Sequence, residues 1–283
     1  MISIPIAVHN ELFEWQLDLF WYNHKLTYGR DAYNKAHAVI MQRNTRNDEI
    51  FETCTWDTDI PHTMCRPYFD YYDTVDHADN TPLNIQCGLI QVIDQFDDDQ
   101  LIEVIDCDMF HFRPHPKLIV GNDQLVVCNI YEDWHMYSQG QYKYLIEPYF
   151  KNGGAHYNGG FVPIIGRVRT FKKVLKDWEF IHRHLLIRND VTNNTNMGAS
   201  FKWWSGMYSL NAACERNGVQ MVAEDSCFIP TRNDCEPHHY IGHYSVDYNY
   251  FCKRKFPNLD FNALPNNLFY NRIRVWYEQW KGG

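Results

Sequence analysis

The segment LIEVIDCDMFHFRP, residues 101–114, constrains the fold of this chain more than any other. Residues 101–105 form a nearly continuous apolar run, which is typical of a strand buried on both faces of an α/β sheet. Asp106 and Asp108 follow directly, at the end of a strand where ligands of open α/β sheets bind. Two neighbouring carboxylates are costly unless a divalent cation such as Mn²⁺ or Mg²⁺, which prefers oxygen ligands, lies between them. The segment therefore predicts a metal site, and two acids that only solvate a strand end are the alternative.

The rest of the chain alternates between strand and helix patterns, as α/β nucleotide-binding proteins do. Apolar residues alternate in 2–8, although Pro5 there is expected only at a first residue or on an edge strand. Residues 43–80 are polar, aromatic and irregular. The predicted strands are 2–8, 36–41, 101–105, 125–130, 161–165 and 219–222, and the predicted helices are 11–24, 168–185, 204–214 and one from Thr81 to the acidic turn at 97–99. We expect one compact α/β domain spanning 1–283, with 152–160 as a Gly-rich loop.

Charge and cysteine content exclude several classes of protein. The formal net charge of −9 argues against nucleic-acid binding, which requires clustered Lys and Arg. The 9 cysteines form no CxxC pair, and several lie in apolar runs, so buried free thiols and a reducing cytoplasm are favoured. No signal peptide or run of about 20 apolar residues is found. We therefore expect a protein without a membrane anchor, in the cytoplasm of a bacterium or of a virus-infected host.

Four blocks of sequence resemble the GT-A glycosyltransferases, in the same order along the chain. The first, ADNTPLNIQCGLIQVIDQF…LIEVIDCDMFHFRP, places Asn80-Thr81-Pro82 where that family has Asn-Lys-Pro, so the family's Lys is missing. Asn158-Gly159-Gly160-Phe161-Val162 resembles the loop and strand that line the sugar pocket. Trp203-Trp204-Ser205-Gly206-Met207-Tyr208 is similar to Trp-x-Ser-Glu-Met-Tyr, with Gly206 in place of Glu. Ile241-Gly242-His243-Tyr244 resembles the C-terminal His-Tyr segment. The likeness covers roughly 75–255 and is greatest to the plant hydroxyproline arabinosyltransferase and serine galactosyltransferase group.

This resemblance implies a GT-A fold with a mixed sheet flanked by helices and a metal-dependent glycosyltransferase activity. The residues 1–110 would form the nucleotide half, by analogy with dinucleotide-binding units, and 111–283 the sugar and acceptor half. His243 would be the third metal ligand beside Asp106 and Asp108, and the metal would be Mn²⁺ or Mg²⁺. The donor would be a UDP-sugar of the UDP-glucose or UDP-galactose kind, and the acceptor a glycan, a protein or a small molecule. The residues expected around the donor are Val8, His9, Asn10, Asn84, Asp106, Cys107, Asn158, Gly159, Gly160, Lys253 and Lys255.

Other roles rest on chemistry alone. A diphosphate leaving group requires positive charge, for which Lys253–Lys255, Arg30 and Arg113 are candidates. An inverting transferase requires a carboxylate base, and Glu224 and Asp225, which follow the predicted strand at 219–222, are the candidates. A retaining enzyme needs no such base, and both stereochemical courses stay open.

Polar residues 189–200 are expected to form a loop that closes over the donor. Rival functions are less consistent with the sequence. A dinucleotide-dependent oxidoreductase would carry GxGxxG after the first strand, where this chain has VHNELFEW. A zinc hydrolase would need a complete set of His and Cys ligands with a general base. A non-catalytic protein that binds carbohydrates or nucleotide sugars on the same scaffold is the alternative to an enzyme.

Overall fold

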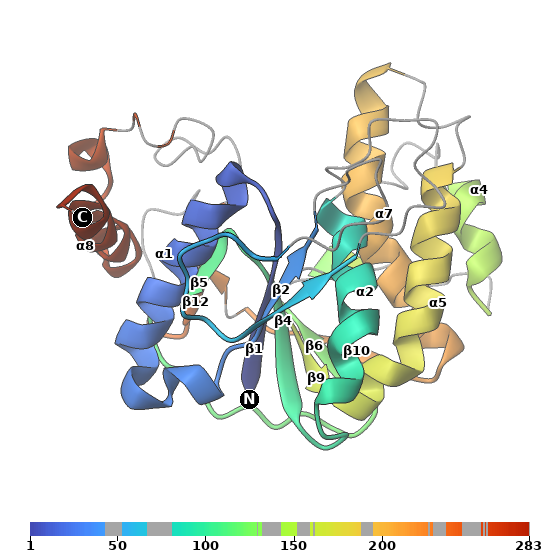
Figure 1. Ribbon diagram of the computed structural model, residues 1–283. Helices are drawn as coiled ribbons and strands as arrows, with labels where there is room; N and C mark the ends of the chain where they lie inside the picture. Colours follow the sequence, from blue (N-terminus) through green and yellow to red (C-terminus); the bar gives the residue numbers. More distant parts are fainter. Residues whose placement is uncertain are drawn as a thin grey trace.

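The computed structural model describes residues 1–42, 53–66, 81–128, 130–131, 143–151, 159–160, 162–187, 195–225, 227–228, 236–244, 256, 258 and 260–282. These residues form an α/β domain with helices on both faces of a central sheet (Figure 1). Four residues named in the predictions above, Asn80, Asn158, Lys253 and Lys255, lie outside the described residues.

The central sheet has 7 strands in the order β10-β6-β9-β4-β1-β2-β3. Its strands are β1 (Ile2–Val8), β2 (Ala38–Met41), β3 (His62–Cys65), β4 (Leu101–Asp106), β6 (Gln124–Val127), β9 (Ile164–Arg167) and β10 (Gln220–Ala223). All neighbouring pairs are parallel except those that β9 makes with β4 and with β6. The chain adds β2 and β3 on one side of β1 and then returns to place β4 on the other side. The carboxyl ends of β1 and β4 therefore flank the point where the strand order reverses, which is where such sheets bind ligands.

The prediction for Pro5 was wrong. Pro5 lies inside β1, and β1 is a central strand that pairs with both β2 and β4. The β1–β2 ladder begins only at Ile6, opposite Val39, and a single bridge joins Ser3 to Ala36 before it. Because Pro5 lies in the interruption between these two, its missing N–H removes no bond from the ladder.

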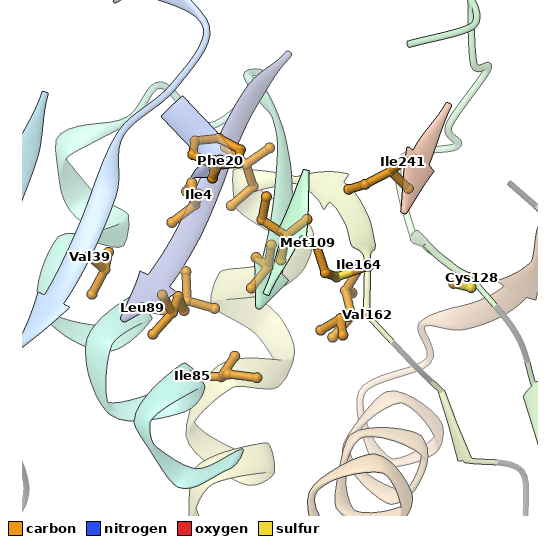
Figure 2. Packing of buried hydrophobic residues seen from close by; sticks show 14 of the residues in the cluster. Ile4, Phe20, Val39, Ile85, Leu89, Met109, Cys128, Val162, Ile164 and Ile241 are labelled. Carbon is orange, nitrogen blue, oxygen red and sulfur yellow. The ribbon is translucent and has the colours of Figure 1, made fainter. Parts of the chain in front are cut away.

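Helices cover the sheet in two layers (Figure 1). One face carries α2 (Thr81–Val92), α5 (Val168–Ile187) and α7 (Thr195–Arg216), and the other carries α1 (Glu11–Tyr28) with α8 (Leu268–Gly282) packed outside it. The indole N–H of Trp178 in α5 donates to the carbonyl of Gly206 in α7 at 2.8 Å. Figure 2 shows Leu89 of α2 and Val39 of β2 in the apolar layer beneath these helices. Since α1 lies between the sheet and α8, it buries residues around most of its circumference, whereas Leu12 at its start is 42% exposed.

Two further sheets lie beside the central one. The small sheet contains β11 (Cys227–Phe228), β12 (Ile241–His243) and β5 (Met109–His111), and β7 (Ile130–Tyr131) pairs with β8 (Gly159–Gly160). Short helical segments are α4 (Lys143–Ile146), η1 (Gly29–Asn34), η2 (Ile93–Gln95), η3 (Glu147–Tyr149) and η5 (Phe261–Ala263). Five described cysteines are buried free thiols: Cys65, Cys87, Cys107, Cys128 and Cys214.

Two expected irregular segments contain regular structure. Within the region predicted to be irregular, His62–Cys65 form the edge strand β3. Only its last residue, Cys65, is buried, so the segment shows no apolar pattern typical of a strand. Residues 195–200, expected in a closing loop, belong to the first turns of α7, because the packing of α7 against α5 overrides a polar composition. Among the described residues no helix is long and apolar enough to cross a membrane.

Candidate metal centre

Asp106 is the last residue of β4, and Asp108 follows after one residue. Asp106 lies beside Ile6 of β1 and is partly exposed, whereas Asp108 is buried. Between them Cys107 points inward, and its thiol donates to the side-chain carbonyl of Gln16 in α1 at 3.3 Å. The apolar strand thus ends in two carboxylates at the carboxyl edge of the sheet, as predicted from the sequence.

His243 reaches these carboxylates through the small sheet. β12 runs antiparallel to β5, which places His243 opposite Met109, the residue after Asp108. The backbone N–H of Tyr244 also donates to the carbonyl of Asp108 at 3.1 Å. The Nε2 atom of His243 lies 3.2 Å from Oδ1 of Asp108. One ligand atom from each of Asp106, Asp108 and His243 lies within 4.8 Å of the others, and we call these three residues the Asp106 group.

Tyr244 is a fully buried residue that follows His243 and contacts the turn that carries Asp108. Burial, together with the charge of Asp108 and the neighbouring Cys107, raises the pKa of Tyr244 well above its ordinary value. Its hydroxyl therefore keeps its proton at neutral pH and donates to the carbonyl of Cys107 at 3.4 Å. The tyrosine thus fixes the turn between the two aspartates without adding a third negative charge to theirs.

The residues after β1 occupy the place expected for the nucleotide. Val8 is 2% exposed, so only its backbone faces that edge. Asn10 caps α1, and its side chain accepts from the N–H of Phe13 at 3.2 Å. His9 is partly exposed, accepts from the N–H of Thr55 at 3.3 Å, and has its ring 5.0 Å from that of Trp56. Of the three residues expected here, His9 offers a side chain to a ligand. Trp56, which was not predicted from the sequence, lies beside His9 and offers a second ring.

Other expected donor contacts have different positions. Asn84 is buried in α2 at 6% exposure, and Gly159 and Gly160 form the strand β8 rather than a loop. Arg113 donates to the carbonyls of Glu236 and His239, both at 2.6 Å, so its guanidinium braces the turn between these two residues. Arg30 is exposed in η1.

The chain contains a second Asp-x-Asp sequence, Asp57-Thr58-Asp59, and its Asp59 has a structural role. Asp59 accepts hydrogen bonds from the indole of Trp21, the hydroxyl of Tyr33 and, at 3.4 Å, the ammonium of Lys25. These bonds lower the pKa of Asp59, with the bond from Tyr33 the largest cause. The carboxylate therefore joins α1 and η1 to the segment that precedes β3.

The two candidate bases separate in the structure. Both follow β10, whose carboxyl end lies at the same edge of the sheet as that of β4. Burial raises the pKa of Glu224, and its Oε2 has no hydrogen-bond partner in the described part of the chain. Asp225 instead faces Nε2 of His238 at 3.6 Å and Nε2 of His239 at 3.7 Å. Glu224 is therefore the better candidate for a base.

Asp225, His238 and His239, which we call the Asp225 group, also bring possible ligand atoms within 4.8 Å of one another. The backbone N–H of Glu236 donates to Nδ1 of His239 at 3.0 Å. A neutral His239 ring must then carry its proton on Nε2, the atom that faces Asp225, and a protonated nitrogen offers no lone pair to a metal. Of the two groups, the Asp106 group is therefore the better candidate for a metal site. The sequence shows the His238-His239 pair but not its approach to Asp225.

Comparison with models of known protein families and with curated proteins found no match to this chain.

The raised pKa of Glu224 gives a testable stability effect. A carboxyl whose pKa is raised in the folded protein binds its proton more tightly there than in the unfolded chain. The free energy of unfolding therefore falls as the pH rises from the ordinary carboxyl pKa through the raised one. At pH 7 the Glu224→Gln variant is expected to be more stable than the wild type, by roughly 0.5 kcal/mol or less because the group is half exposed. The difference should vanish below the ordinary carboxyl pKa. Urea unfolding at pH 7 and at a pH below the ordinary carboxyl pKa measures this difference in the free energy of unfolding. A variant less stable than the wild type at pH 7 contradicts the prediction.

Proposed function

We propose that this chain is a metal-dependent glycosyltransferase of the GT-A type that transfers a sugar from a UDP-sugar to an acceptor. The observation that carries the proposal is the Asp106 group, two carboxylates and an imidazole at the carboxyl end of β4. The group lies where the strand order reverses, beside the end of β1, which is the expected nucleotide position. The resemblance in sequence at 101–114 and 241–244 supports the same conclusion.

The donor atoms of the Asp106 group fit Mn²⁺. Carboxylate oxygens with one imidazole are ligands that Mn²⁺ accepts, and the partial exposure of Asp106 and His243 leaves one side open to a substrate. A bound cation would neutralise the diphosphate of the donor as the bond to the sugar breaks. Asp106, Asp108 and His243 would hold that cation, and the buried Tyr244 would keep the turn between the aspartates in place.

The nucleotide would lie along the ends of β1 and β4. The N-terminus of α1 faces that edge because the helix follows β1 after two residues, and a helix N-terminus favours a negative group such as a diphosphate. The rings of His9 and Trp56 provide flat, partly exposed surfaces beside it, on which a base can stack. For an inverting reaction, Glu224 would take the proton from the acceptor hydroxyl, since its raised pKa suits a general base.

Calorimetric titration of UDP, with and without Mn²⁺, tests the proposal. We expect the wild type to bind UDP only when Mn²⁺ is present, and the Asp108→Ala variant to lose that binding. Asp123→Ala is the matched control, because Asp123 precedes β6 at the opposite edge of the sheet and its side chain pairs with Lys173. Absence of UDP binding under both conditions would overturn the assignment of UDP. Binding with no transfer or hydrolysis of a UDP-sugar would instead support the non-catalytic binding protein.

A further inference from the structure

A fully buried carboxylate lies within β4, below the metal site. Glu103 is 0% exposed and accepts three hydrogen bonds from three other segments. Ser3 Oγ of β1 donates to Oε2 at 2.8 Å, His111 Nε2 at the end of β5 donates to Oε2 at 2.8 Å, and the hydroxyl of Tyr240 donates to Oε1 at 3.0 Å. An ionised carboxylate only accepts, so all three partners are the donors.

The charge state of Glu103 makes these bonds important. Burial alone raises its pKa, but His111, His115 and the bond from Ser3 outweigh that effect and lower the pKa to about 2. Glu103 is therefore ionised at neutral pH inside the protein. A buried charge is very costly unless it is fully hydrogen-bonded, so the three donors are held firmly against it.

Glu103 and two of its three partners correspond one by one to the members of the Asp106 group. Glu103 precedes Asp106 by three residues on β4, His111 follows Asp108 by three residues through β5, and Tyr240 precedes His243 by three residues along the segment that becomes β12. Three residues of extended chain span about 10 Å. The hydrogen bonds of Glu103 thus join, one layer below the metal site, the same three segments that carry its ligands.

We propose that Glu103 is a positioning residue for the metal centre: its bonds to His111 and Tyr240 fix the placement of the small sheet against β4, and thereby the distance of His243 from the two aspartates. The inference rests on the proposed function only in taking the Asp106 group as the metal site. Tyr240 is the partner of Glu103 that acts on His243, because it lies three residues before His243 on the segment that leads into β12, whose ladder with β5 has three residue pairs. The Tyr240 ring packs 4.2 Å from that of His115 and 5.8 Å from that of His111, so its position depends on more than the hydroxyl.

Tyr240→Phe removes the hydroxyl and keeps the ring. The expected result is Mn²⁺ affinity weakened about tenfold, the size of effect that follows loss of a group orienting a ligand. Ser3→Ala is the matched control, since it removes a bond to the same carboxylate from β1, which carries none of the three ligands. The Mn²⁺ affinity of Ser3→Ala is expected to stay within about twofold of the wild type, even if its thermal stability falls as much as that of Tyr240→Phe.

Mn²⁺ alone is the probe, followed by electron paramagnetic resonance on the full chain at a temperature where each variant is folded by circular dichroism. Tyr240→Phe and wild type with equal Mn²⁺ affinity would overturn the positioning role and leave the proposed function intact. Equal losses in Tyr240→Phe and Ser3→Ala would also overturn it, because they would show a general loss of packing. A wild type that binds no Mn²⁺ would refute the metal site and this inference with it.

Discussion

Replacing Asp108 by asparagine is expected to weaken Mn²⁺ binding by at least about 100-fold, since even the loss of a group outside the ligand shell costs roughly 10- to 100-fold. The substitution keeps the shape of the side chain and removes its charge, at a position where the carboxylate is only 7% exposed and lies 3.2 Å from His243. Asn provides a neutral oxygen in place of a hard anionic one, which Mn²⁺ binds more weakly. The loss should be visible directly, by electron paramagnetic resonance of free Mn²⁺, and through thermal stability.

Thermal stability offers an independent measurement. A metal that binds only the folded chain at 100 times its dissociation constant adds about 2.7 kcal/mol to the free energy of unfolding. We expect Mn²⁺ to raise the melting temperature of the wild type but not that of Asp108→Asn. The Asp225→Asn variant is the matched control, because the Asp225 group also combines a carboxylate with imidazoles. A melting temperature that responds to Mn²⁺ in Asp108→Asn but not in Asp225→Asn would move the metal site to the Asp225 group.

The parts of the fold that the sequence predicts are those with regular apolar spacing. The strands β1 and β4 and the helix α5 lie within a few residues of their predicted bounds, because each buries a continuous face and its pattern reflects that face. Asp106 and Asp108, at the end of β4 and just after it, could be placed at a sheet edge for the same reason. The short strands β5 and β12 could not, since three residues carry no period and their pairing joins Met109 to His243 across the chain.

Glu103 shows why the supporting residues of the site escaped prediction. In the sequence Glu103 is a single polar residue within an apolar run, and this run predicts a buried strand. The structure confirms the strand as β4, but the run gives no sign of the role of Glu103. Its partners lie 100 residues away at Ser3 and 137 residues away at Tyr240, so no local pattern connects them. His243 entered only through the resemblance to a family, and the physical reason for its position, the ladder between β5 and β12, became visible in the structure.

The C-terminal helix α8 carries the other large expected effect, at Phe269. The ring of Phe269 is 0% exposed, stacks on that of Phe110 at 4.8 Å, and meets that of Phe112 edge-on at 5.9 Å. It also lies against the backbone of β12, where a Cβ atom added to Gly242 would come within 2.1 Å of it. Phe269→Ala is therefore expected to lower the free energy of unfolding by about 3–5 kcal/mol, as the loss of a fully buried ring does. Phe180→Ala, which removes a ring that is 45% exposed on α5, should change it by about 0.5 kcal/mol or less.

A double-mutant cycle with Gly242 tests whether this packing is as close as the structure has it. Gly242→Ala alone forces a methyl group into the ring of Phe269 and is expected to cost about 1–3 kcal/mol. In the Phe269→Ala background the same methyl group enters the space that the ring has left, so the cost should fall to near zero or become a small gain. Urea unfolding of the four proteins gives the coupling energy. Costs that simply add would mean that the ring does not lie on Gly242, and that α8 does not hold the strand that carries His243.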